Sequence, residues 1–224
     1  MMVLEMAGVR KDYTRAGKTF AAVSRADLNS GEGEIVGITG PSGSGKSTLF
    51  NIVAGLVKPT AGSVRILGRD ITGMSRSLLA EMRRTDIGVV LQGRNLLQNF
   101  TVLENICMPA ALGKRDGDAV RKGMELLEAF GLKGMENEYP SVLSGGERRR
   151  VSIIRAFVHT PKLVIADEPT SNLDDENARI IMDAFKEASE RKVTILVSSH
   201  DVNLLPKYAT RKYTMIQGEL SPWE

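Results

Sequence analysis

The sequence predicts an α/β fold in which a mostly parallel sheet carries crossover helices. Short apolar, β-branched runs at 35–39, 87–92, 163–166 and 193–199 have the length and composition of buried strands. Helical patterns separate these runs, and that alternation is typical of a parallel sheet. From 93 to 156 the pattern is mainly helical, so we expect a helical segment inserted between two strands of the sheet.

The individual elements follow in order along the chain. "IVGIT" (35–39) is a strand that runs into a turn at Gly40, and a helix is expected from about 45 to 55. "VRILG" (64–68) is strand-like, and "IGVVLQ" (87–92) is a buried strand. In the inserted segment, Thr101 and Glu104 form a capping-box pattern at 101–106, and 117–132 has apolar residues at helical spacing. A further helix at 175–191 joins the last two strands.

Composition and charge exclude several classes of protein. Hydrophobic residues make up 42% of the 224 residues and charged residues 25%, the balance of an ordinary globular protein. The net charge is only +3, and no concentrated basic face is evident, so we do not expect a nucleic-acid partner. The densest basic run, 148–150, is interpreted as mostly a solvated helix face.

The cysteine count and the hydropathy bear on location. Cys107 is the only cysteine, which excludes an intrachain disulfide and favours a reducing compartment. Glu5 interrupts the apolar residues near the N-terminus, so these residues do not form the continuous apolar segment of a signal peptide. No run approaches the ~18 apolar residues of a membrane span. We therefore expect no direct membrane insertion, and any membrane role would come through a partner.

A phosphate-binding loop is the strongest motif. "GPSGSGKST" (40–48) fits G-x-x-x-x-G-K-[ST] and lies between a strand and a helix, where backbone N–H groups and the helix N-terminus attract phosphate. Lys46 is placed to reach the β- and γ-phosphates, and the Ser47 hydroxyl to bind Mg²⁺. Nucleotide contacts are expected from Gly40, Pro41, Ser42, Gly43, Ser44, Gly45, Lys46, Ser47 and Thr48.

A pair of acidic residues supports nucleotide hydrolysis. The apolar strand in "LVIADE" (163–168) delivers Asp167 and Glu168 to its C-terminal end, the edge where open parallel sheets bind ligands. Asp167 is expected to hold Mg²⁺, and Glu168 to orient and activate the attacking water.

A second glycine-rich stretch, "LSGGE" (143–147), points to another phosphate site. Ser144 and Glu147 form a capping-box pattern, so a helix is expected to open there. Gly145 and Gly146 permit close backbone approach, and the helix N-terminus offers donors to an anion.

Together these stretches resemble the ATP-binding subunits of ABC transporters, over nearly the whole chain. "LSGGE" is similar to the family's LSGGQ signature, with Glu147 in the last place. Gln92 resembles the glutamine of the Q-loop, which is a Mg²⁺ ligand in the family, and "SNLD" (171–174), ending in Asp174, resembles the D-loop. His200 resembles the switch histidine that contacts the γ-phosphate. Tyr13 stands where the family places an adenine-stacking aromatic residue, although simple packing is the alternative.

The resemblance implies a fold and a domain organisation. The fold implied is that of a P-loop NTPase with a mostly parallel sheet core, an N-terminal antiparallel β subdomain and an inserted helical subdomain. Residues 1–224 would form one ATPase domain. Within it, 1–92 and 157–224 would form the nucleotide-binding core, and 93–156 the helical subdomain with the signature motif.

The resemblance also implies a mechanism and partners. ATP and Mg²⁺ would be bound, and the catalytic residues would be Glu168, His200, Gln92 and Lys46. Two copies would form a head-to-tail dimer in which each ATP lies between the loop at 40–48 of one subunit and the signature of the other. The dimer would drive an integral membrane permease from the cytoplasmic face of the cell membrane. A short permease helix is expected to dock in a groove at about 93–105 and Met108.

Three assignments within the family stay open at this point. "YPSVLSGGE" (139–147) and the segment at 93–112 resemble the LolD- and MacB-like group of lipoprotein-release and export ATPases. An FtsE-like cell-division ATPase that regulates cell-wall enzymes through a permease is the alternative. A non-transport ABC ATPase is a third. The group commonly continues its signature with "QQR", whereas three arginines follow here. His159, Cys107, Trp223 and the methionines fall in no motif and are assigned structural roles.

Overall fold

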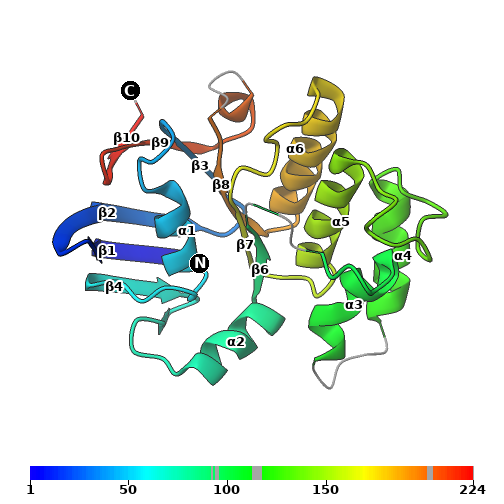
Figure 1. The fold of residues 1–224 in the computed structure, drawn as a ribbon, viewed down its shortest axis with the longest axis horizontal. Coiled ribbons are helices and arrows are strands. Elements are labelled where there is room, and N and C mark those ends of the chain that lie inside the picture. Colours follow the sequence, from blue (N-terminus) through cyan, green and yellow to red (C-terminus); the bar gives the residue numbers. More distant parts are fainter. Residues whose placement is uncertain (92, 94–95, 113–117, 201–203, 224) are drawn as a thin grey trace.

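The protein is an α/β molecule built on one large mixed sheet, as the sequence predicts (Figure 1). The computed structural model describes residues 1–224 except 92, 94–95, 113–117, 201–203 and 224. Among the described residues the sheet has ten strands, in the order β5-β4-β1-β2-β10-β9-β3-β8-β7-β6. The described residues contain no helix that is both long enough and apolar enough to cross a membrane.

The central strands are parallel and buried. β3 (Ile35–Thr39), β8 (Thr194–Ser198), β7 (Leu163–Ala166) and β6 (Ile87–Val90) pair in parallel, and β9 (Arg211–Ile216) lies parallel to β3 on its other side. The four expected buried strands are thus confirmed, with ends that differ by a residue or two. Their continuous apolar runs follow from burial on both faces of the sheet.

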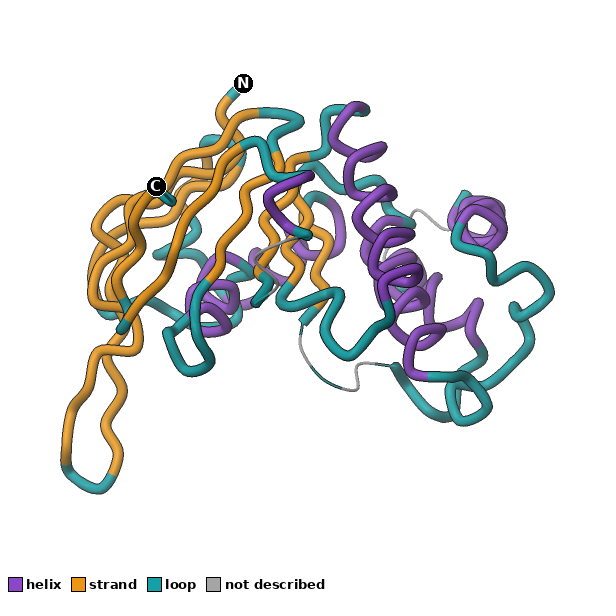
Figure 2. Tube along the Cα trace, turned by 90° about the horizontal axis from the view of Figure 1, so that it is seen from above, coloured by secondary structure: helices purple, strands orange, loops and turns teal. Residues whose placement is uncertain are grey.

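An antiparallel region covers the N-terminal part of the chain, as the family resemblance implies. β1 (Met2–Arg15) lies between β2 (Lys18–Gly31) and β4 (Ala61–Ile66), and β5 (Arg69–Asp70) closes this edge. β10 (Glu219–Pro222) runs antiparallel to β9 and joins the two regions through its pairing with β2. The antiparallel strands lie at one end of the molecule and α3 and α4 at the other (Figures 1 and 2).

Helices cover both faces of the parallel strands. The cluster on one face contains α1 (Lys46–Val53) and α2 (Arg76–Thr85); α2 has no counterpart among the predicted elements. The cluster on the other contains α3 (Val102–Ala111), α4 (Ala119–Ala129), α5 (Gly145–Phe157) and α6 (Asp175–Glu190). A short 3-10 helix, η1 (Leu205–Lys207), precedes β9. Along β8, Ile195 and Val197 belong to the second cluster and Leu196 to the first, because side chains alternate across a sheet.

Both predicted capping boxes are present. The Thr101 hydroxyl accepts from the Glu104 N–H at 3.2 Å, and the Glu104 carboxylate accepts from the Thr101 N–H at 2.7 Å. Ser144 and Glu147 repeat this arrangement at the start of α5, with the same two distances. Each box satisfies donors that the first turn of a helix leaves unpaired, so both helix starts are fixed by local sequence.

Candidate functional site

The loop at 40–48 wraps the end of β3 and leads directly into α1. Gly45 caps α1 with a left-handed φ of 106°, and no side chain accepts from the first-turn amides. A Cβ at this position would lie 2.1 Å from the carbonyl oxygen of Ala22, so only glycine fits. The N-terminal amides of α1 therefore face the loop without a side-chain acceptor, which makes this helix end suited to phosphate.

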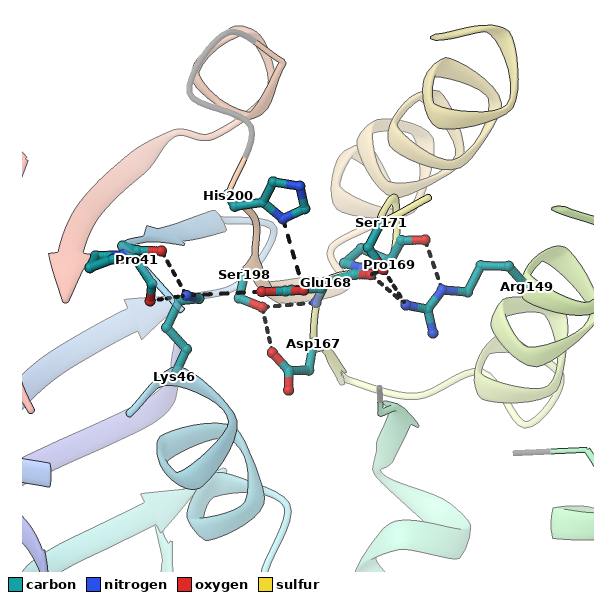
Figure 3. Close-up of polar contacts among 10 residues, drawn as sticks. Pro41, Lys46, Arg149, Asp167, Glu168, Pro169, Ser171, Ser198 and His200 are labelled. Carbon is teal, nitrogen blue, oxygen red and sulfur yellow. Dashed lines mark hydrogen bonds and ion pairs between the residues drawn. The ribbon is translucent and has the colours of Figure 1, made fainter. Parts of the chain in front are cut away.

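Lys46 is buried within the loop that precedes it. Its side chain is only 5% exposed, and Nζ donates to the carbonyl oxygens of Gly40 at 2.7 Å and Pro41 at 3.0 Å (Figure 3). The Oγ of Ser44, also buried, has no hydrogen-bond partner among the described residues. A buried ammonium held by two neutral carbonyls, next to an unsatisfied hydroxyl, suits an incoming anionic group.

The acidic pair follows β7 directly and is held by β8. The hydroxyl of Ser198 donates to Oδ1 of Asp167 at 2.6 Å and accepts from the backbone N–H of Glu168 at 2.8 Å (Figure 3). Asp167 is 2% exposed. No role was predicted for Ser198, although it lies in the predicted strand at 193–199, two residues before His200.

The Glu168 carboxylate lies between two cationic or ionisable groups from other parts of the chain. Its Oε1 is 3.9 Å from Lys46 Nζ, and its Oε2 is 3.8 Å from Nδ1 of His200. His200 follows β8, and its side chain is 64% exposed. Three residues far apart in the sequence thus meet at the C-terminal edge of the parallel strands (Figure 3).

The remaining predicted residues near this edge have different outcomes. Gln92 lies outside the described residues. Ser47 is exposed in the first turn of α1. Asp174 caps α6, where it accepts from the N–H of Asn177 at 2.8 Å, and this hydrogen bond holds the pKa of the carboxyl below its usual value.

Tyr13 lies on β1 and is 37% exposed. Its ring is 6.2 Å from that of Phe20 on β2, and Nζ of Lys11 lies 5.1 Å from the Tyr13 centroid. Phe20 was not predicted, and cross-strand pairing in a hairpin is the signal that relates it to Tyr13.

The signature stretch lies on the opposite face of the sheet from the phosphate loop. α1 contributes Leu49 and Phe50 to the cluster on one face, whereas α5 contributes Val151 and Ile153 to the other. Figure 1 shows α1 beside β2, and α5 beside α6. At the start of α5 an added Cβ on Gly145 would meet no atom within 4 Å. This helix end therefore presents an open backbone surface.

Glu147 is a partly buried residue in the first turn of α5. The hydrogen bond that its carboxylate accepts from the Ser144 N–H lowers its pKa, and Arg150 and Arg148 nearby add smaller contributions in the same direction. The capping box is thus strongest with the carboxylate ionised.

The interpretation of 148–150 as a solvated helix face is wrong. All three side chains are partly buried and donate to oxygens of other segments. Arg148 donates to the carbonyl of Leu143, and Arg150 to Oδ1 of Asn177. α5 packs between α3, α4 and α6, and each arginine reaches past its own helix to a carbonyl or amide oxygen. Charge in a sequence does not tell whether such oxygens lie within reach.

The segment before α3, where permease docking was predicted, is held by a buried asparagine. Asn105 is fully buried; its Oδ1 accepts from the Leu97 N–H at 2.8 Å, and its Nδ2 donates to the carbonyls of Leu97, Phe100 and Thr101. Leu96 is buried, whereas Leu97 is 46% exposed. Within the predicted docking segment, therefore, only Leu97 of these two leucines is placed to contact a partner.

Known proteins resemble this chain over most of its length. Residues 23–171 match the family model described as ABC transporter. The chain is 41% identical to the lipoprotein-releasing system ATP-binding protein LolD of Buchnera aphidicola subsp. Schizaphis graminum, over 92% of this chain and 91% of that protein. The LolD protein of Buchnera aphidicola subsp. Acyrthosiphon pisum is 35% identical over 92% and 91% of the two chains.

Solved structures of ABC cassettes share the fold. The ATP-binding cassette MJ0796, in a dimeric post-hydrolysis state bound to ADP and Pi, superposes with a TM-score of 0.91 at 35% identity, covering 99% of both chains. A nucleotide-free cassette from an ABC transporter superposes with a TM-score of 0.81 at 26% identity, covering 98% of this chain and 90% of the other. The phosphate loop, the acidic pair, the signature helix and these likenesses together place the chain in the ABC transporter family, as an ATP-hydrolysing transporter subunit.

Proposed function

We propose that the chain binds ATP with Mg²⁺ and hydrolyses it in a head-to-tail homodimer that drives a membrane permease of the lipoprotein-release type. The observation that carries this proposal is the position of Glu168, between Lys46 and His200 at the end of β7. A carboxylate at the mouth of a phosphate-binding loop suits activation of water for attack on a terminal phosphate.

The residues present fit a magnesium nucleotide. The buried Ser44 hydroxyl and the uncapped N-terminus of α1 are suited to phosphate oxygens, as is Lys46 once it exchanges the Gly40 and Pro41 carbonyls for phosphate. The Ser47 hydroxyl and Asp167 carboxylate supply the hard oxygen ligands that Mg²⁺ prefers, beside phosphate and water. Gln92 is proposed as a further ligand on family grounds. When bound, Mg²⁺ neutralises charge on the phosphates.

The proposed chemistry is in-line attack of water on the γ-phosphorus, which breaks its bond to the oxygen bridging to the β-phosphate and releases ADP and inorganic phosphate. Glu168 orients the water and accepts its proton, Lys46 stabilises charge on the β- and γ-phosphates, and His200 contacts the γ-phosphate. The Ser198 hydroxyl holds the Asp167 carboxylate and the backbone of Glu168 in fixed positions relative to each other. This chemistry depends on positioning and electrostatics, and no covalent intermediate is required.

A second copy completes the site. The start of α5 and the loop at 40–48 belong to opposite faces of the sheet, so residues 144–147 serve the nucleotide of another subunit more readily than their own. Ser144, Gly145 and Gly146 offer donors to that γ-phosphate, and Asp174 lies on the neighbouring helix α6. The dimeric MJ0796 cassette bound to ADP and Pi, 35% identical to this chain, supports this assembly.

The partner is proposed to be an integral membrane permease at the cytoplasmic face of the membrane. Identity of 41% to LolD over 92% of this chain favours the lipoprotein-release branch over a cell-division role. Residues 93–156 are proposed as the helical subdomain that receives the permease, and 1–92 with 157–224 as the nucleotide-binding core. The exposed Leu97 side chain, on a backbone fixed by Asn105, lies in the segment where docking is proposed.

The experiment that tests the proposal uses Glu168→Gln, which keeps the shape of the side chain and removes its charge. This variant is expected to bind ATP without turnover and to elute as a dimer with Mg-ATP but not with Mg-ADP, measured by size-exclusion chromatography with light scattering. Lys46→Ala is the matched control, because loss of the phosphate-binding ammonium should prevent the ATP-dependent dimer. A Glu168→Gln protein that stays monomeric at saturating ATP, both alone and with its permease, contradicts the proposal.

A further inference from the structure

Arg149 connects the signature helix to the backbone of the acidic pair. It lies in the second turn of α5, and its guanidinium points toward the segment after β7 (Figure 3). Nε donates to the carbonyl oxygen of Pro169 at 2.9 Å, Nη1 to that of Leu91 at 3.2 Å, and Nη2 to that of Glu168. One side chain thus bridges α5, the end of β6 and the turn that carries the proposed catalytic carboxylate.

The backbone that Arg149 holds is strained. Glu168 has a φ of 48°, in the left-handed region that residues other than glycine rarely occupy. Two sets of hydrogen bonds fix this conformation. On one side the Glu168 N–H donates to Ser198 at 2.8 Å, and on the other its carbonyl accepts from Arg149 and from the Ser171 hydroxyl at 3.0 Å. The direction of the Glu168 carboxylate depends on this backbone, because Cα sets the origin of the side chain.

Arginine is suited to this position by its geometry. Its planar guanidinium has five donors in a fixed fork, so it reaches three carbonyls at once, whereas glutamine has two donors on a shorter stem. Burial lowers the pKa of Arg149, and the nearby carboxylates of Asp167 and Glu168 favour its charged form. Its positive charge therefore lies close to the acidic pair while its donors are used on neutral oxygens.

We propose that Arg149 is a positioning residue for ATP hydrolysis. By holding the backbone at Glu168, it fixes the direction of the Glu168 carboxylate relative to helix α5. The proposal rests on the proposed function, in which Glu168 activates water. Because α5 begins with the residues that meet the partner's nucleotide, the same helix positions one subunit's signature and, through Arg149, its own catalytic carboxylate.

The test compares Arg149→Met with a matched control elsewhere. The guanidinium of Arg83 on α2 also donates hydrogen bonds to two carbonyl oxygens, those of Ala54 at 3.1 Å and Gly55 at 3.2 Å. Burial lowers the pKa of Arg83, as it does that of Arg149. Arg149→Met is expected to lower kcat by about 10–100-fold, the effect of misplacing a catalytic group by about 1 Å, with KM and nucleotide affinity changed less than about twofold. Arg83→Met is expected to lower Tm by about as much as Arg149→Met does and to leave kcat unchanged. Arg149→Lys, with one ammonium, should recover part of kcat.

The outcomes separate this inference from the proposed function. Wild-type kcat in Arg149→Met, or a fall in kcat matched by an equal loss of ATP affinity, overturns the positioning role. If Arg149→Met does not fold, Arg149→Leu is measured in its place with the same expectation of a selective loss of kcat. Turnover that persists in Glu168→Gln instead overturns the role of Glu168, whatever Arg149 does.

Discussion

At the scale of single residues, the acidic pair is placed by hydrogen bonds and not by its ion pairs. Glu168 lies 3.9 Å from Lys46 and 3.8 Å from His200, long distances for ion pairs. By contrast, the hydrogen bonds through Ser198 are 2.6 and 2.8 Å, and Arg149 and Ser171 hold the other side of the turn. The carboxylate is therefore anchored through the backbone of its own residue, and its two ion pairs add less to its placement.

Tyr13 gives a prediction at this scale. If its exposed ring stacks on adenine, Tyr13→Ala should weaken ATP binding by roughly 1–3 kcal/mol, the range for stacking of a base on an aromatic side chain. Tyr13→Trp should bind almost as well as the wild type, because it keeps a flat aromatic face. Titration with a fluorescent ATP analogue measures both. An unchanged affinity in Tyr13→Ala would show that the ring only packs on Phe20 and Lys11.

At the scale of one element, the start of α5 should show a defined pH dependence. The pKa of Glu147 is lower in the folded state than in the unfolded chain. The stability that its ionised carboxylate contributes is therefore fully present above the unfolded-state pKa of about 4.3, and it is lost as the pH falls through the lower folded-state pKa. Glu147→Gln lacks this ionisation. We expect it to be less stable than the wild type by about 0.3–1 kcal/mol at pH 7, with the gap shrinking in acid below pH 5.

Urea denaturation at pH 7, 5 and 4 measures this gap. Glu190→Gln, a change of the same charge at the exposed last residue of α6, serves as the control and should show no loss of stability at pH 7. A gap for Glu147→Gln that stays constant from pH 7 to pH 4 would mean that the ionised carboxylate does not stabilise the capping box.

The segment before α3 provides a second prediction at the scale of an element. Leu97→Asp should leave ATP binding and basal hydrolysis intact and abolish stimulation by the permease, because its exposed side chain lies on the proposed docking surface. Leu96→Asp buries a charge in the core and should instead lower Tm markedly. ATPase assays with and without reconstituted permease, with thermal melts, distinguish the two. Normal permease-stimulated turnover in Leu97→Asp would place the docking surface elsewhere.

At the scale of the whole molecule, the two phosphate sites are expected to act between subunits. Lys46→Ala damages the loop at 40–48, and Ser144→Arg damages the signature, so each homodimer should be inactive. In a mixed dimer one composite site is intact, since its loop comes from the Ser144→Arg chain and its signature from the Lys46→Ala chain. The mixture should regain part of the ATPase activity that neither variant shows alone. Activity that never rises above the sum of the separate variants contradicts shared sites.

Local sequence determined much of this protein. The apolar β-branched runs specify strands buried on both faces, and Ser144 with Glu147 fixes the start of α5 through contacts three residues apart. Glycine, lysine and serine at set spacing specify the phosphate loop, because they act within one turn of chain. The family and its ATPase activity were predictable because these motifs carry the resemblance to ABC transporter ATPases.

Only the tertiary structure decided how the segments meet. Ser198 is 31 residues from Asp167, and Arg149 is 58 residues from Leu91, so no local pattern relates them. The predicted solvated face at 148–150 is wrong for the same reason. Hydropathy and charge report what a side chain tolerates, whereas its partners depend on which backbone oxygens the fold places within reach. The positioning of the Glu168 carboxylate belongs to that second kind of information.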